Sequence, residues 1–166
     1  MDQVEHSKWK TLLKTNDFFG VFSDEELDQF LNVGHASRYR MHEYIVKENT
    51  QAKKFYVILK GKVDIVKEIA IKGKTQISSL DAGYVVGEIA MLLSEKRTAT
   101  VIAGEETFVF SIEANKIEHL PIEMQVKLYR QLAVFLSEKL KSLSRASAEQ
   151  LLGLSEWYLG DGKYGS

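Results

Sequence analysis

Short apolar runs separated by glycine-containing turns fill the middle of the chain, between Tyr39 and Ile112. The run at residues 55–59 is rich in β-branched and aromatic residues, which is typical of a strand. Turn signals at residues 60–62 and 72–74, both Lys-Gly-Lys, punctuate the pattern. Further apolar runs follow at residues 63–66, 69–71, 77–80, 100–103 and 107–112. Strands this short and this closely spaced predict an antiparallel sandwich or barrel, because a parallel sheet would need a helix between successive strands.

Two short helices are predicted before this β-rich region. The first covers residues 7–15 and places three apolar side chains on one face: Trp9, Leu12 and Leu13. Ser23 and Glu26 have the spacing of a capping box, in which each residue accepts a hydrogen bond from the backbone N–H of the other. The second helix begins there and is expected to bury residues at i, i+3 and i+4: Leu27, Phe30 and Leu31.

A long amphipathic helix is predicted after Pro121, the only proline, which suits the first position of a helix. Its apolar residues recur at alternating spacings of four and three, the a/d pattern of a coiled coil: Ile122, Val126, Tyr129, Ala133, Leu136, Leu140 and Leu143. Leu128, Leu132 and Phe135 broaden this face. A helix over residues 121–145 would be about 37 Å long. It could pack on the β domain or extend past it and pair with a second copy, and its length favours the dimer.

Composition places the chain among ordinary globular proteins. Its 166 residues include 22 Lys and Arg against 23 Asp and Glu, so the formal net charge is −1, which argues against binding nucleic acid along a whole face. No apolar run is long enough to span a membrane, and the polar, acidic start differs from a secretory signal. The absence of cysteine excludes disulfides, thiol chemistry and cysteine-bound metals. We expect a cytoplasmic protein.

Residues 83–101 fit neither the strand pattern nor the long helix. A glycine turn leads into a short helix over residues 88–93, whose first N–H groups, from Ile89 and Ala90, would be free to bind an anion. The guanidinium of Arg97 could bind the same anion, and Thr98 adds a hydroxyl and another N–H. The carboxylate of Glu88 would be repelled by the anion unless it accepts hydrogen bonds from donors such as sugar hydroxyls. A phosphorylated sugar would therefore suit Glu88 and Arg97 together. The alternative is an internal Glu–Arg pair beside a tight turn.

The string Gly-Glu-Ile-Ala-Met-Leu at residues 87–92, followed by Arg-Thr-Ala-Thr-Val at residues 97–101, resembles the phosphate-binding cassette of the cyclic nucleotide-binding domain family. Catabolite activator protein, kinase regulatory subunits and cyclic-nucleotide-gated channels belong to this family. The resemblance implies that Glu88 accepts the ribose 2′-hydroxyl and that Arg97 binds the cyclic phosphate. It implies that the N–H groups of Ile89, Ala90 and Thr98 complete the cradle. Two small residues would allow the ligand to approach the backbone closely: Gly87 and Ala99.

The chain departs from the family pattern outside the implied ligand contacts. Met-His-Glu at residues 41–43 stands where a Pro-Gly-Glu-like turn is usual, and Lys96 stands where a proline often precedes the arginine. Asn49 replaces a common glycine, and we expect the turn to survive because asparagine tolerates the left-handed conformation. A threonine at position 98 is associated with cyclic GMP in the family, and both cyclic AMP and cyclic GMP are expected to bind.

Signals for catalysis or metal binding are missing from the sequence. No two of the four histidines have a metal-ligand spacing, no phosphate-binding loop of the nucleotide triphosphatases occurs, and no Ser/His/acid set is suggested. We therefore predict no enzyme activity, no catalytic residue, no metal and no cofactor. An enzyme on a β-barrel is a less favoured alternative.

The sequence thus predicts a mainly β fold with flanking helices, an antiparallel β-roll of the jelly-roll type. It comprises N-terminal helices, the roll over about residues 36–112, a short phosphate-binding helix and a long helix over about 121–145. Residues 1–145 would form the domain, with 146–166 as a lid or a disordered tail. The function predicted is a cyclic nucleotide sensor that switches its C-terminal helix, forms a homodimer through it and acts on an unknown protein partner. Direct DNA binding is not expected, because about 20 residues follow the long helix. The alternative is a degenerate domain that serves as a scaffold without ligand.

Overall fold

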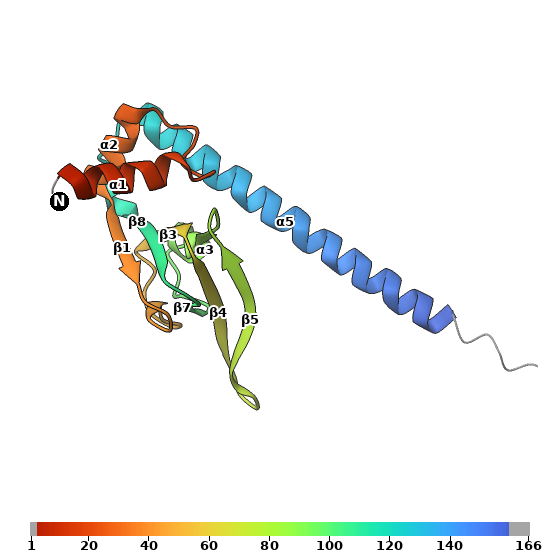
Figure 1. Cartoon of the computed structure of the whole chain (residues 1–166). Helices are drawn as coiled ribbons and strands as arrows, with labels where there is room; N and C mark the ends of the chain where they lie inside the picture. Colours follow the sequence, from red (N-terminus) through yellow and green to blue (C-terminus); the bar gives the residue numbers. More distant parts are fainter. Residues whose placement is uncertain (1–2, 160–166) are drawn as a thin grey trace, which may run out of the picture. The chain divides into compact units, whose positions relative to one another are not determined.

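The computed structural model describes residues 3–159, and the side chains of the last helix as far as residue 147 (Figure 1). The chain divides into two compact units, Met1–Val126 and Lys127–Ser166, and the boundary falls inside that helix. The elements follow in this order: α1 (Gln3–Lys14), α2 (Asp24–Val33), β1 (His35–Tyr39), β2 (Tyr44–Val46), β3 (Lys54–Lys60), β4 (Lys62–Ile69), β5 (Gly73–Asp81), β6 (Val85–Val86), α3 (Glu88–Leu92), β7 (Thr100–Ala103), β8 (Thr107–Glu113), α4 (Ala114–Ile117) and α5 (Ile122–Leu159).

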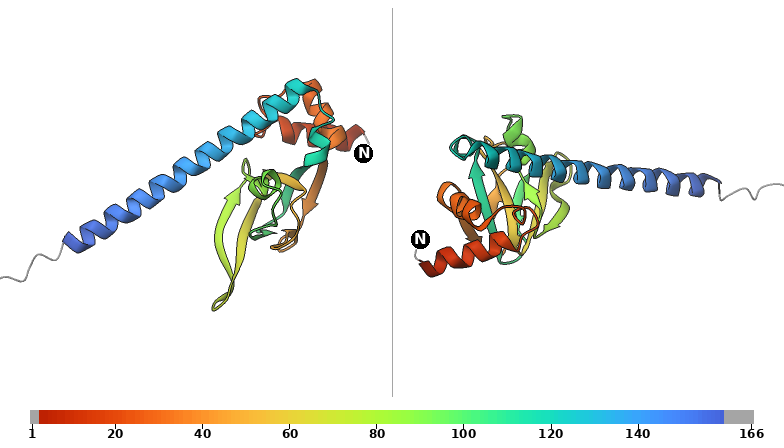
Figure 2. Two further views of the ribbon diagram at one scale, coloured as in Figure 1. Left: turned by 180° about the vertical axis from the view of Figure 1, so that it is seen from behind. Right: turned by 90° about the horizontal axis from the view of Figure 1, so that it is seen from above.

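Two four-stranded antiparallel sheets form the body of the first unit. Their strand orders are β1-β8-β3-β6 and β2-β7-β4-β5, so strands far apart in the sequence lie side by side, as Figure 2 shows from two further sides. Val57 of β3 lies opposite Phe110 of β8, and Ile65 of β4 lies opposite Val101 of β7. The predicted fold class, an antiparallel β-roll with N-terminal helices, a short helix and a long C-terminal helix, is confirmed.

Both sheets contribute to one hydrophobic core. The β-branched and aromatic residues that predicted strands are the ones that meet there: Ile45, Val46, Tyr56, Ile58, Val63, Val86, Val101, Ala103 and Val109. β5 lies at the edge of its sheet, and most of its side chains are exposed. The core therefore holds β3, β6 and β7 in place, and these strands flank the segment with the candidate anion site.

Both predicted N-terminal helices are present, although α1 begins at Gln3, four residues before its predicted start. Ser23 caps α2, since its Oγ accepts a hydrogen bond from the Glu26 N–H at 3.2 Å and its own N–H donates to Glu26 Oε2 at 2.8 Å. Phe19, in the turn between α1 and α2, is fully buried, and its ring lies 5.4 Å from that of Phe30 and 5.5 Å from that of Phe110. These edge-on ring contacts join α2 to β8.

α5 differs from its prediction in two respects. It continues to Leu159, so the helix end expected near Arg145 was wrong, and residues 160–166 of the expected tail lie outside the described residues. Leu128 and Leu132, which were expected to broaden the a/d face, are fully buried. Most of the a/d residues are exposed, among them Leu140 at 66% and Leu143 at 59%. α5 therefore presents an open apolar stripe along its own surface.

Within residues 3–159, left-handed backbone occurs at three non-glycine residues, His42 (φ 71°), Asn49 (φ 64°) and Ser94 (φ 56°). This confirms that Asn49 adopts the turn expected of it. His42 replaces the usual glycine, and its N–H donates to the Ala103 carbonyl at 2.7 Å, which holds the strained conformation in place.

We expect His42→Gly to raise the free energy of unfolding by up to about 1 kcal/mol. Left-handed backbone costs an L-residue about 1–2 kcal/mol, and the greater freedom of glycine in the unfolded chain offsets part of the gain. Met41→Gly is the control, because Met41 has no positive φ, and it should lower stability by about 0.4–1 kcal/mol. Urea unfolding measures both, and equal destabilisation by the two variants would contradict the account.

Candidate functional site

The short helix predicted inside the β domain is present as α3. Gly87 precedes it in the left-handed conformation, with φ 78°, and no side chain caps the helix. A Cβ atom built on Gly87 would lie 2.2 Å from Nη1 of Arg97, so the position has room only for a hydrogen. Glycine is therefore required here twice, by its backbone conformation and by the close approach of the arginine.

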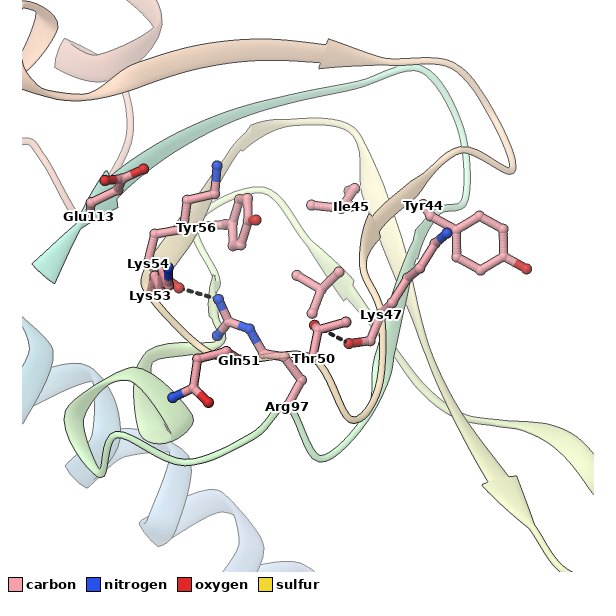
Figure 3. Close-up of a pocket in the computed structure, with 11 residues that line it drawn as sticks. Tyr44, Ile45, Lys47, Thr50, Gln51, Lys53, Lys54, Tyr56, Arg97 and Glu113 are labelled. Carbon is pink, nitrogen blue, oxygen red and sulfur yellow. Dashed lines mark hydrogen bonds between the residues drawn. The ribbon is translucent and has the colours of Figure 1, made fainter.

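The guanidinium of Arg97 is held by backbone carbonyls from two other segments. Its Nη1 donates to the Gly87 carbonyl at 2.6 Å, and its Nη2 donates to the Lys54 carbonyl on β3, the second bond being visible in Figure 3. The Cζ atom lies 5.8 Å from the ring centroid of Tyr56. These bonds use two of the five guanidinium N–H groups and leave three.

The backbone of Arg97 is anchored on the turn between β2 and β3. Its N–H donates to the Thr50 carbonyl at 2.8 Å, and its carbonyl accepts from the Asn49 N–H at 2.8 Å. The left-handed backbone at Asn49 belongs to this turn. Sequence reasoning noted Asn49 but missed its role, together with the contacts from Lys54 and Tyr56, since partners about 40 residues away leave no periodic signal.

Charge in the site is strongly desolvated. The side chains of Glu88 and Arg97 are 1% and 5% exposed. Burial lowers the pKa of the Arg97 guanidinium, while Tyr56 and Glu88 act in the opposite direction. Burial also raises the pKa of Tyr56. The charges of Glu88 and Arg97 offset each other, so the attraction of this site for an anion rests on hydrogen-bond donors: the guanidinium N–H groups and the first N–H groups of α3.

The remaining predicted residues lie around the same helix. Among the described residues, none accepts a hydrogen bond from the N–H of Ile89 or Ala90, as expected for the first turn of a helix. Ile89 and Thr98 are exposed, Ala90 is buried and Ala99 is half-buried. The structure therefore brings Gly87, Arg97 and the start of α3 together, and leaves Thr98 open to solvent.

Other kinds of site are not found in the described part of the chain. Residues 3–147, whose side chains the structure describes, hold no group of three or more His, Asp and Glu side chains arranged to bind a metal ion. No helix within the same residues combines the length and the apolar character that crossing a membrane requires.

Comparison with known proteins decides the family. The family model of the cyclic nucleotide-binding domain matches residues 36–121, from β1 to the residue before α5. The chain belongs to this family. The cyclic nucleotide-binding domain covers more than half of the chain, including both sheets, α3 and Arg97.

Individual relatives agree with this assignment. The cGMP-dependent protein kinase egl-4 of Caenorhabditis elegans is 24% identical over 126 residues, which is 76% of this chain but only 16% of the kinase. A cyclic nucleotide-binding domain from Methylobacillus flagellatus has the same fold, with a TM-score of 0.67 at 23% identity over 90% of this chain and 84% of that one. The catabolite activator protein of Thermus thermophilus superposes with a TM-score of 0.65 at 22% identity, over 83% and 62% of the two chains.

Proposed function

We propose that the chain is a regulatory, non-catalytic module that binds a 3′,5′-cyclic nucleotide at the start of α3. One observation carries the proposal: the guanidinium of Arg97 is bonded to the Gly87 carbonyl beside the open N–H groups of the short helix. In this proposal the cyclic phosphate accepts from Arg97 and from the N–H groups of Ile89, Ala90 and Thr98.

Three further predicted residues would provide space for the phosphate and a contact to the ribose. The bare Cα of Gly87 and the small side chain of Ala99 leave room for the phosphate to approach the backbone. Glu88 is a buried carboxylate next to this position, and in the proposal it accepts the ribose 2′-hydroxyl.

Regulation is proposed to pass through α5 to a partner protein. Cyclic nucleotide binding would change the equilibrium between two positions of α5, which requires different affinities for the two states. The exposed a/d stripe of α5 supports a homodimer formed along this helix. The downstream partner in this proposal is a protein.

A second candidate function is a scaffold domain that keeps the fold without binding a ligand. Its support is that Arg97 already satisfies two backbone carbonyls, which is a structural role in its own right. The two candidates differ in the result expected when a cyclic nucleotide is added.

Thermal unfolding with cyclic AMP or cyclic GMP tests the proposed function. A ligand that binds the folded state at 100 times its dissociation constant adds about 2.7 kcal/mol of stability. For a chain of this size that corresponds to a rise in melting temperature of about 5–10 °C. No rise with either nucleotide at millimolar concentration, in protein freed of co-purified nucleotide, would favour the scaffold.

Base preference is expected to depend in part on Thr98, whose side chain is exposed next to Arg97. A hydroxyl that bonds the guanine amino group would contribute about 0.5–1.5 kcal/mol, so Thr98→Ala should weaken cyclic GMP binding roughly 2–10-fold. Cyclic AMP affinity should stay nearly unchanged and serves as the internal control. Equal losses for both nucleotides would show that Thr98 serves only the shared phosphate.

A further inference from the structure

A pocket of about 410 Å³ lies beside Arg97, on the side of the turn that joins β2 to β3 (Figure 3). This volume suits a small molecule. Buried apolar residues of β2, Ile45 and Val46, form part of its wall, together with Tyr56 of β3. None of the residues at the start of α3 lines the pocket, so it is separate from the proposed phosphate cradle except at the arginine.

Positive charge dominates the pocket lining. A single carboxylate, Glu113, and four cations line it: Lys47, Lys53, Lys54 and Arg97. Within the described part of the chain, no carboxylate forms an ion pair with any of the three lysines. An excess of three positive charges around a cavity of this size attracts a multiply charged anion.

Aromatic rings hold two of these lysines in position. Lys54 Nζ lies 5.4 Å from the ring centroid of Tyr56, the same ring that Arg97 approaches at 5.8 Å. Lys47 Nζ lies 5.4 Å from the ring of Tyr44, which also lines the pocket. Cation–π contacts reduce the freedom that a lysine must lose when it binds a ligand, so these ammonium groups are partly preorganised.

We propose that this pocket binds the phosphate or diphosphate group of a small molecule, and that this anion shares Arg97 with the cyclic nucleotide site. A phosphate group matches the lining better than a carboxylate, because several lysines can each donate to its oxygens and its charge offsets more of theirs. Arg97 connects the sites, since it lines the pocket and also bonds the Gly87 carbonyl next to α3.

Because the pocket anion and the cyclic nucleotide would share one guanidinium, we expect each to weaken the binding of the other. This part of the inference rests on the proposed function. An anion in the pocket would occupy N–H donors of Arg97 and neutralise the charge that attracts the cyclic phosphate. We expect each ligand to weaken the other about fivefold or more, and by the same factor, because coupling between equilibrium binding sites is reciprocal.

Titration calorimetry of the full chain with inorganic pyrophosphate, in magnesium-free buffer without cyclic nucleotide, tests the pocket directly. The double variant Lys47→Gln/Lys53→Gln should lose pyrophosphate affinity by about tenfold or more, because both lysines are exposed and can change without disturbing the core. The control Lys67→Gln/Lys72→Gln removes the same charge from the β4–β5 hairpin, outside the pocket lining, and should bind like the unmodified chain.

Several outcomes would overturn the inference. Absence of pyrophosphate binding at millimolar concentration, or equal losses in the two double variants, would exclude a specific site in the pocket. If pyrophosphate displaces the cyclic nucleotide but its affinity is unchanged in Lys47→Gln/Lys53→Gln, the anion binds at the start of α3 and not in the pocket. Cyclic nucleotide affinity unchanged by saturating pyrophosphate would refute the shared arginine. Because the first titration contains no cyclic nucleotide, its result stands whether or not the proposed function is correct.

Discussion

Arg97→Ala is expected to weaken cyclic nucleotide binding by roughly 10–150-fold, as measured by calorimetric titration. The substitution removes a charge-assisted donor from a buried site, and such a hydrogen bond contributes about 1.5–3 kcal/mol. The same change leaves the carbonyls of Gly87 and Lys54 without their donor, so the free energy of unfolding should also fall, by about 1–3 kcal/mol.

Two further variants separate binding from folding. Arg97→Lys keeps the positive charge but loses the fork of N–H groups, so it should recover part of the stability and little of the affinity. Lys96→Ala removes an exposed neighbouring cation and should leave the affinity within about twofold. A folded Arg97→Ala protein that binds cyclic nucleotide like the unmodified chain would contradict the role given to Arg97.

Leu140→Glu is expected to dissociate the proposed homodimer, as measured by light scattering across a protein concentration series. Leu140 is 66% exposed on the a/d stripe of α5. Each dimer would lose two buried leucines, worth about 3–6 kcal/mol together, and would gain two charges in the seam. The β-roll should remain folded, because Leu140 belongs to the second compact unit.

Ser142→Glu is the matched control for the dimer. It introduces the same charge two residues away, outside the a/d stripe, at an exposed position. The dimer should persist in this variant. An unmodified chain that is monomeric at high protein concentration, with and without cyclic nucleotide, would refute dimerisation through α5.

Elements with a local signal could be predicted from the sequence. The capping box of Ser23 and Glu26 fixed the start of α2, and Lys-Gly-Lys turns bounded β4. The short helix after Gly87 was also foreseen, because a glycine turn precedes a few helix-forming residues. β6 and α4 have two and four residues, too few for any periodicity to show.

The end of α5 was misplaced for an identifiable reason. The heptad pattern stops at Leu143, and the helix was predicted to end shortly after it, near Arg145. The next residues, 146–152, contain neither proline nor glycine and include alanine, glutamate, glutamine and leucine, which favour helix whether or not an apolar stripe continues. Helix propensity therefore accounts for the continuation of α5 through residues 146–152, where no heptad pattern is present.

The contacts around Arg97 could be predicted only in part. Its closeness to Gly87 and α3 followed from the resemblance of the cassette string. Its bond to the Lys54 carbonyl and its position over Tyr56 depend on how β3 lies against the loop before β7, which is a property of the tertiary fold. The basic pocket was missed for the same reason, since its lysines lie on a turn and a strand whose neighbours the sequence does not reveal.

Calorimetric titration of the unmodified, nucleotide-free chain with cyclic AMP and with cyclic GMP tests most directly whether the chain binds a cyclic nucleotide. We expect saturable binding of both nucleotides, with one molecule per chain. A chain that unfolds cooperatively but binds neither nucleotide at concentrations up to millimolar would contradict this expectation.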